Sequence, residues 1–532
     1  MFSYNTHRFV YVLALAIIAC SLPFSVFTTS VGSITLLVNF VLEGNWRFKY
    51  NNLKQNRLLW VWLFIYLPIL YSSFYSSSTS IAIKELRLWL PFVVLPLVVA
   101  TNNPLSYKEF RRVLLLFVLA VFVATLISTT YFATLSSYEV IDVRKISLFI
   151  SHIRFALMVN LAMAILFYLV VFDTCERSRI SKGIMIVIFL WLLVFLFILQ
   201  SLTGIVMLFL MLLLIFFWFY FKIREAAVRF VLATLALMVI FLGSSSLTHQ
   251  IEKFYTRNKI DLASLPERTQ NGNAYQHDTV RLAYENGNLI YINVCSPELQ
   301  KEWERRSRIK FDGLDKKGQN LEQTLLRYMT SLGLTKDSAG VAKLDSIDVN
   351  FIESGAASVI FRNDNFGIDK RLYQLLWEFD AYRTEGLVDR SSVIQRFVYA
   401  RAAWFVIKKH LWFGVGWGDI HKSLDDFYRV KQVNLEKDLR FMPHNQYLTV
   451  WVGAGILGLL VFIVAFVFPF LAKKEYKNFL SLYFFLMIMV SMLNEDTFES
   501  HIGITFAVLF YSLFIFGFSF KPKIDESEPS SN

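Results

Sequence analysis

Long apolar runs separated by short polar segments dominate the sequence. They lie near residues 9–26, 30–43, 59–75, 83–100, 113–134, 147–172, 184–199, 203–222, 229–244, 446–470, 478–493 and 501–520. A helix of roughly 20 apolar residues crosses the hydrocarbon core of a bilayer. The pattern therefore predicts an all-α polytopic membrane protein with about twelve transmembrane helices. Pro23 interrupts the first run and the second is short, so this pair fits two crossings or a shallow hairpin, and both return the chain to the same side.

Basic residues gather in alternate connections between these runs. The clusters are Arg47, Lys49, Lys54 and Arg57; Lys108, Arg111 and Arg112; Arg177, Arg179 and Lys182; Lys222, Arg224 and Arg229; Lys473, Lys474 and Lys477; and Lys521 and Lys523. Loops that stay cytoplasmic carry such an excess. We therefore expect both termini in the cytoplasm and residues 245–445 on the periplasmic side. The net charge of +12 follows this loop pattern, which disfavours a nucleic-acid partner.

The predicted organisation has four parts. Residues 1–244 form a membrane bundle of about nine spans, 245–443 a periplasmic loop domain, 444–520 a second bundle of three spans, and 521–532 a disordered cytoplasmic tail. Helical spacing within the loop covers 298–311, 320–333 and 369–383, whereas 341–362 is predicted to be irregular or a short strand. Cations interrupt residues 396–412, which predict an interfacial helix. Cys20, Cys175 and Cys295 fall in different surroundings, so we expect no disulfide.

A histidine precedes the glycine-spaced apolar run in RFMPHNQYLTVWVGAGILG, residues 440–458. Pro443 suits the first turn of a helix, so His444 is expected just inside the helix N-terminus. Helical spacing predicts one stripe that faces the bundle, formed by His444, Leu448, Trp451, Gly455 and Gly458. The positive end of the helix dipole favours a neutral imidazole that can accept a proton. An interfacial capping histidine explains this helix equally well.

Three arginines could bring guanidinium groups to the same place. Arg154 follows His152 near the outer end of an apolar run, where it faces a cavity or extends to the interface. Arg396 and Arg401 project about 140° apart on the predicted interfacial helix, so we assign Arg401 to lipid headgroups and Arg396 to the site. Together with Arg440 these side chains suit the oxygens of a pyrophosphate. The turn GVGWGD, residues 414–419, is a weak phosphate signal, and a plain turn is favoured.

The last outward turn, MLNEDTFESHIG, is acidic. It carries Glu495, Asp496 and Glu499 before His501, without Lys or Arg. These carboxylates could orient a histidine or an arginine, although solvated turn residues are slightly favoured. No DxD triplet occurs in the chain, so the sequence requires no divalent metal and no cofactor.

Three stretches in the last quarter of the chain stand out together: RSSVIQRFVYARAAWFVIKKHLWFGVGWGD, MPHNQYLTVWVGAGILGLL and NEDTFESHIG. They resemble signature blocks of the O-antigen ligase and polymerase superfamily. LLRYMTSLGLTKDSAGVAKL, residues 325–344, also resembles the outer loop of members from the Bacteroidetes, whereas the front half matches only in architecture. The resemblance implies a fold similar to the GT-C glycosyltransferases. It also implies metal-independent glycan transfer from undecaprenyl pyrophosphate at the periplasmic face of the bacterial inner membrane.

The resemblance assigns roles to individual residues. It makes Arg396 the arginine of the surface helix, His444 with Asn445 the HN pair, and Glu495 the acid of the final turn. One departure concerns the turn QSLTGIV, residues 200–206, where members often carry Arg or Lys and this chain has Leu202. Either Arg154 and Arg440 hold the phosphates, or the chain is a divergent member.

The favoured function is O-antigen ligation to lipid A core in lipopolysaccharide biosynthesis, with His444 as the base and Arg396 as its catalytic partner. Arg154, Arg440, Asn445 and Glu495 would bind substrate among membrane lipids. An O-antigen polymerase and a protein O-oligosaccharyltransferase remain alternatives, because the same residues suit all three. A polysaccharide transporter or flippase is a different class, and it should place charges near the bilayer midplane rather than at the outer surface.

Overall fold

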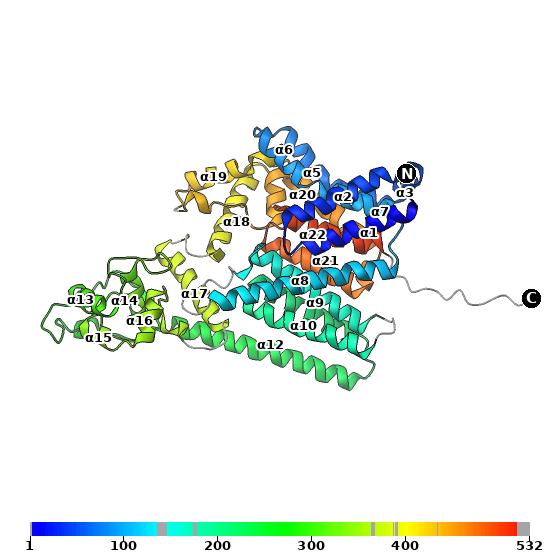
Figure 1. The fold of residues 1–532 in the computed structure, drawn as a ribbon. Helices are drawn as coiled ribbons and strands as arrows, with labels where there is room; N and C mark the ends of the chain where they lie inside the picture. Colours follow the sequence, from blue (N-terminus) through cyan, green and yellow to red (C-terminus); the bar gives the residue numbers. More distant parts are fainter. Residues whose placement is uncertain are drawn as a thin grey trace, which may run out of the picture. The chain divides into compact units, whose positions relative to one another are not determined.

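The computed structural model describes residues 3–135, 146–173, 178–362, 368–386, 388, 392–433 and 435–518. The chain forms two compact units. The membrane unit comprises Met1–Ser137, Ile141–Lys222 and Val388–Asn532, and the loop unit comprises Tyr138–Val140 and Ile223–Leu387. Helices dominate both, and the sheet in the described residues is one antiparallel pair, β1 (Tyr284–Glu285) and β2 (Asn288–Leu289) (Figure 1).

Among the residues that the structure describes, seven helical segments are long and apolar enough to cross a membrane, or eight if a bent pair counts as one span. They are Arg57–Phe74 (α4 to α5), α8 (Tyr107–Leu135), α9 (His152–Val171), α10 (Arg179–Leu199), α11 (Leu202–Tyr220), α12 (Ala226–Tyr255) and α20 (Gln446–Ala472). The bent pair is α2 (Val26–Leu42) with α3 (Trp46–Gln55), and α21 (Phe479–Asn494) and α22 (His501–Ser512) are shorter apolar helices. The multi-pass helical class is thus confirmed, and the count of twelve stays a prediction.

Polar side chains begin many of these helices. Ser3 caps α1 (Tyr4–Ser21), and Ser151, Ser178 and Ser201 cap α9, α10 and α11 by accepting a backbone N–H with the hydroxyl. Such caps satisfy donors that a helix leaves free at its start. The caps at Ser151, Ser178 and Ser201 therefore mark where α9, α10 and α11 begin in the membrane unit.

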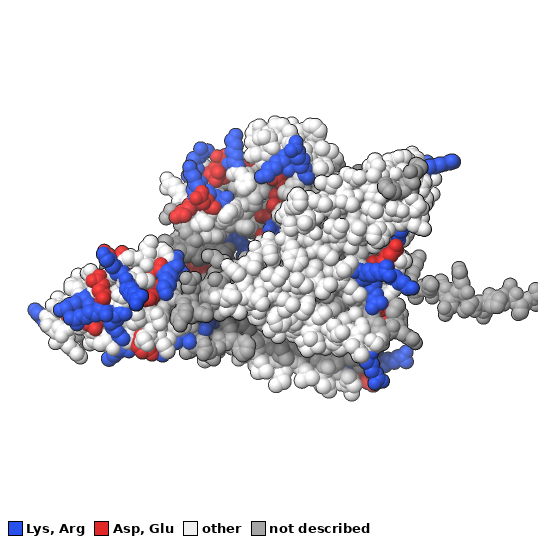
Figure 2. Space-filling model, viewed as in Figure 1, with Lys and Arg blue, Asp and Glu red and all other residues white. Residues whose placement is uncertain are grey.

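Charged side chains gather at the ends of the membrane unit, and a broad uncharged band lies between them (Figure 2). At one end, Arg8 pairs with Glu109 at 2.6 Å and Lys49 with Glu43 at 2.9 Å. These residues lie at the starts of α1 and α8 and around the turn after α2, in the part of the chain predicted to be cytoplasmic. An uncharged band bounded by charge is what a bilayer requires.

The apolar run at 83–100 is not one continuous helix. It divides into α6 (Thr79–Leu88), which carries Lys84, Glu85 and Arg87, and α7 (Pro91–Thr101). Pro91 sits at the first position of α7, where its missing N–H costs nothing. The prediction missed this break because the residues on both sides of it are apolar.

The glycine-spaced helix α20 breaks at Gly455, whose φ of 71° is left-handed. The predicted stripe from His444 to Gly458 is therefore wrong, because residues on either side of the break do not share one helical face. Amides of a neighbouring turn donate to the freed carbonyl groups: Val415 N donates to Val452 O at 2.9 Å and Gly416 N to Gly453 O at 3.0 Å. The turn GVGWGD, residues 414–419, thus completes the backbone pairing of a broken membrane helix.

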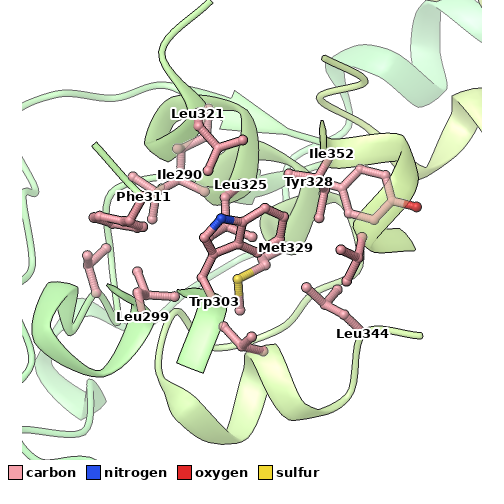
Figure 3. Packing of buried hydrophobic residues seen from close by; sticks show 14 residues of the cluster. Ile290, Leu299, Trp303, Phe311, Leu321, Leu325, Tyr328, Met329, Leu344 and Ile352 are labelled. Atoms are coloured by element: carbon pink, nitrogen blue, oxygen red, sulfur yellow. The ribbon is translucent and has the colours of Figure 1, made fainter. Parts of the chain in front are cut away.

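The loop unit holds α12 and a small domain with its own core (Figure 3). Its helices are α13 (Ser296–Arg306), α14 (Leu321–Ser331), α15 (Ser338–Ala342), α16 (Ser346–Glu353) and α17 (Ile368–Glu385). Trp303, Leu325 and Tyr328 are fully buried there. Helices were predicted close to α13, α14 and α17. The prediction for 341–362 was wrong, because Asp345 starts α16 with a reciprocal capping box that includes Asp348.

The compact units differ from the predicted domains at both boundaries of the loop. The loop unit starts at Ile223 and includes all of α12, whereas residues 388–443, with α18 (Ser392–Lys409) and α19 (Ile420–Val430), belong to the membrane unit. Cys20 and Cys295 are free thiols, and Cys175 and the predicted tail lie outside the described residues.

Candidate functional site

The predicted site residues lie around the turn between α21 and α22. Two hydrogen bonds fix this turn beside the starts of α11 and α20. Asn494 Nδ2 donates to Thr203 Oγ1 at 2.9 Å, and Asn445 Nδ2 donates to Leu493 O at 3.0 Å. Helix ends that are distant in sequence thereby meet at one end of the membrane unit, opposite the pairs of Arg8 and Lys49.

His444 lies just outside α20, not inside it as predicted from Pro443. Asn445 is the N-cap, because its side chain accepts from Leu448 N at 3.1 Å, and His444 takes a left-handed φ of 50°. Asp496 holds this uncommon conformation: its Oδ2 accepts from His444 N at 2.7 Å and its Oδ1 from Thr449 Oγ1 at 2.5 Å. The backbone of His444 is therefore fixed by a carboxylate from the opposite turn.

Two aromatic rings border the imidazole of His444. The ring centroid of Tyr399, on α18, lies 5.5 Å away and that of Phe441 lies 6.0 Å away. The Tyr399 hydroxyl donates to Leu439 O, which ties α18 to the segment before His444. The imidazole is thus enclosed on its aromatic side and about one quarter exposed, at 26%.

Glu495 is the centre of the cluster. Its Oε1 lies 3.8 Å from His444 Nδ1 and its Oε2 lies 3.7 Å from Arg396 Nη2. Arg154, at the start of α9, interacts electrostatically with the same carboxylate. Burial opposes ionisation of Glu495, but His444, Arg154 and Arg396 together lower its pKa below the usual range. The carboxylate is therefore charged at neutral pH and holds three cationic or basic groups around one point.

Four polar atoms of this cluster are buried without a hydrogen-bond partner among the described residues. They are Arg154 Nε, Arg396 Nε, His444 Nδ1 and Glu495 Oε2. Buried polar atoms are normally satisfied, and where the chain supplies no partner an ordered water or a ligand does so. Two guanidinium donors beside an imidazole suit an anionic, hydroxyl-bearing ligand.

Two further carboxyl groups lie deeper in the same turn. Burial raises the pKa of Asp496 to about 6, and burial together with Glu85 and Asp496 raises the pKa of Glu499 well above its usual value. Gln446 Nε2 donates to Glu499 Oε1 at 3.5 Å, and Gln446 Oε1 accepts from Phe498 N at 2.8 Å. The outer part of the cluster is thus charged, whereas the deeper carboxyl groups of Asp496 and Glu499 can take up protons.

Arg440 is placed apart from this cluster. Its guanidinium lies 3.6 Å from Asp425 Oδ1 and 5.0 Å from the ring of Tyr428, both on α19, and its Nε donates to Leu435 O at 3.1 Å. Among the described contacts, none joins Arg440 to Glu495 or His444. The structure therefore brings together Arg154, Arg396, His444 and Glu495, with Asn445 as the cap beside them.

Sequence reasoning did not single out two residues of the site, Tyr399 and Thr449, and it named Asp496 only as one of several carboxylates of the final turn. Tyr399 lies three positions after Arg396, so helical spacing puts both on one face of α18 and could have revealed it. Thr449 lies four positions after the N-cap Asn445. Asp496 was visible beside Glu495, but only the fold distinguishes the carboxylate that faces the arginines from the one that binds backbone.

No group of three or more His, Cys, Asp or Glu side chains in the described ranges is placed to hold a metal ion. The fold and the cluster together define a multi-pass membrane protein with a partly buried cluster of histidine, arginine and carboxylate side chains at one end of its helices. Residues 358–463 match the family model of the O-antigen ligase, which confirms the resemblance to that superfamily. The matched region contains Arg396, Arg440, His444 and Asn445, while Arg154 and Glu495 lie outside it. No curated protein matches the chain. The domain indicates a glycan transferase of ligase or polymerase type that uses a lipid-linked glycan donor.

Proposed function

We propose that this protein transfers a glycan from undecaprenyl pyrophosphate to a hydroxyl of lipid A core at the periplasmic face of the inner membrane. The observation that carries the proposal is the convergence of Arg154, Arg396 and His444 on Glu495, within and beside an O-antigen ligase domain. We extend the proposal to both termini in the cytoplasm, about twelve spans and a GT-C-like fold.

In the proposed reaction His444 is the general base. Glu495 faces Nδ1 and favours the tautomer that carries its proton there, which leaves Nε2 to accept the proton of the acceptor hydroxyl. The hydroxyl oxygen attacks the anomeric carbon and forms the new glycosidic bond. The bond between that carbon and the phosphate oxygen breaks, and undecaprenyl pyrophosphate leaves with the electron pair. A single displacement of this kind inverts the anomeric configuration.

The arginines of the site stabilise the leaving group in this scheme. Arg396 Nη2 lies 3.7 Å from Glu495 Oε2, which is too long for tight pairing, and Arg154 interacts electrostatically with the same carboxylate. A pyrophosphate can therefore take up their free Nε donors without breaking a short salt bridge. Glu495 then stabilises the imidazolium that forms on His444. Asn445 positions the ring through the backbone, and Arg440, held by α19, would contact the glycan or the outer phosphate.

Purified protein in lipid vesicles, supplied with a defined lipid-linked glycan and lipid A core, tests this proposal. Transfer with inversion is the expected result, and Arg396→Ala should abolish it while leaving the protein folded in the membrane. Normal transfer by that variant would refute the assignment of Arg396.

The polymerase alternative differs only in the acceptor, which would be a second lipid-linked repeat. The family match covers both activities. A deletion strain separates them: loss of a ligase leaves long lipid-linked chains and bare core, whereas loss of a polymerase leaves core capped with single repeats. Unglycosylated periplasmic proteins in that strain would instead indicate a protein O-oligosaccharyltransferase. Movement of the lipid-linked glycan without covalent transfer would indicate a flippase.

A further inference from the structure

The helix α18 has two different long faces. One face packs inside the membrane unit through Ile394, Val398, Tyr399, Ala402, Ala403, Val406 and Ile407, which are at most 3% exposed. The opposite face is exposed along its whole length. Its members are Val393, Phe397, Arg401, Trp404 and Lys408, which fall within an arc of about 80° at helical spacing.

Aromatic and cationic side chains are paired along this exposed face. The guanidinium of Arg401 lies 6.0 Å from the ring of Phe397, and Lys408 Nζ lies 5.8 Å from the ring of Trp404. Phe397 and Trp404 are nevertheless 55% and 45% exposed. Aromatic rings combined with cations are typical of the membrane–water interface, where rings lie at headgroup level and cations reach lipid phosphates.

The aromatic surface continues beyond the end of α18. Leu411, Trp412 and Phe413 are 40%, 61% and 61% exposed. Residues 392–413 contain no Asp or Glu, so the segment itself carries a net positive charge. In Figure 1, α18 runs across the direction of α8 and α9, as a helix in the plane of a bilayer would.

We propose that the exposed face of α18 binds the anionic headgroups of membrane phospholipids, with a phosphate between Arg401 and Lys408. These cations are two helical turns apart on the same side, about 10 Å along the axis. Phe397 and Trp404 lie between and beside them and insert at the depth of the glycerol backbone. The other side of the same helix presents Arg396 and Tyr399 to His444, so lipid binding would fix the depth of the site in the membrane.

Binding of short-chain phosphatidylglycerol to the purified full chain in detergent tests this proposal, with short-chain phosphatidylcholine as the neutral comparison. The double variant Arg401→Gln/Lys408→Gln should lose at least tenfold in affinity for phosphatidylglycerol and should not change for phosphatidylcholine. A matched control, Lys301→Gln/Lys343→Gln, removes two exposed cations from the loop unit and should bind as the wild type does. The charge-keeping variant Arg401→Lys/Lys408→Arg should retain binding, which separates loss of charge from loss of fold.

Equal affinity of the wild type for the two lipids would overturn the proposal. Unchanged phosphatidylglycerol binding by Arg401→Gln/Lys408→Gln would also overturn it. A third contradicting result would be a double variant that loses affinity only for undecaprenyl phosphate, measured in the same assay, because that loss would indicate a donor site instead. The binding assay needs no glycan transfer. His444→Ala should therefore bind phosphatidylglycerol normally, and failure of the proposed enzymatic function is recognised separately from failure of this proposal.

Discussion

The two units each contain a buried glutamate beside an arginine and a ring, and the two clusters are built differently. In the loop unit, Glu285 accepts from Arg327 Nε at 2.8 Å and from the Tyr373 hydroxyl, and Arg327 lies 3.7 Å from the ring of Trp377. In the membrane unit, the corresponding distances from Glu495 are 3.7 Å and 3.8 Å. The carboxylate of Glu285 is fully buried and that of Glu495 is 11% exposed.

This difference distinguishes a structural ion pair from the cluster that we propose as a binding site. A buried charge with short hydrogen bonds on both oxygens is satisfied, and losing one partner destabilises the fold. A buried charge with long contacts and unpartnered donors around it gains from a ligand that supplies the missing bonds. Arg327 thus links α14 to β1 and α17 within the loop unit. Arg396 and Arg154 instead remain available for an anion.

The largest expected effect is on catalysis at the membrane cluster. Replacing His444 by Ala removes the proposed base, and general-base catalysis contributes a factor of about 10² to 10⁴. We expect glycan transfer in vesicles to fall at least 10²-fold, with an unchanged melting temperature. His410, an exposed histidine at the end of α18, provides the matched control, and His410→Ala should transfer at the wild-type rate. If His444→Ala and His410→Ala lost comparable glycan-transfer activity, the membrane cluster would no longer be distinguished as a catalytic site.

The second effect is on stability in the loop unit. Arg327→Met leaves Glu285 buried without its cation, which typically costs about 3 to 5 kcal/mol. We expect hydrogen exchange of the full chain in detergent to accelerate over α13 to α16 and over the adjoining α17. The double variant Arg327→Met/Glu285→Gln should recover much of the protection, because no unpaired charge remains. Unchanged exchange in the single variant would show that the pair does not hold the domain together.

The sequence predicted more of the site than of its geometry. Arg396 could be named as a candidate because it lies on a predicted surface helix. The residues alone fitted His444 equally well to a capping role, and the resemblance favoured it as a candidate base. Residue patterns alone left Glu495 undecided between a solvated turn and an orienting acid. Its central place depends on the packing of α9, α18 and α21, which local periodicity does not encode. The position of His444 outside α20 and the break at Gly455 were missed because each depends on hydrogen bonds to distant segments.

A third prediction concerns the pH dependence of stability, and it tests the difference between Asp496 and Glu495 in the turn between α21 and α22. Burial raises the pKa of Asp496 to about 6, so its contribution to stability is present at acidic pH and is lost as pH rises through that value. Asp496→Asn cannot ionise. The melting temperature of the variant relative to the wild type should therefore increase from about pH 4 to about pH 6 and then level off. The corresponding gain approaches about 3 kcal/mol, at about 1.4 kcal/mol for each pKa unit.

Thermal melts of both proteins across this pH range provide the measurement. Both proteins should carry Glu499→Gln, because Asp496 contributes to the raised pKa of Glu499 and the two titrations are coupled. A constant difference between the two melting temperatures would show that Asp496 keeps its ordinary pKa. In that case its hydrogen bonds to His444 N and Thr449 Oγ1 outweigh its burial.

The smallest effect is expected at Leu202, where the resemblance described in the sequence analysis implies a cation. Leu202 begins α11, is 50% exposed, and precedes Thr203, which accepts from Asn494 next to Glu495. Leu202→Arg adds a guanidinium at the end of the helices that holds Arg154 and Arg396, so it should lower the KM for the lipid-linked donor about threefold, the scale of one exposed charge interaction. The kcat should stay the same, because the base is untouched, and Leu202→Gln serves as the uncharged control. Equal KM values for the Arg and Gln variants would mean that the two native arginines already saturate the pyrophosphate, and that the missing cation of this chain has no functional cost.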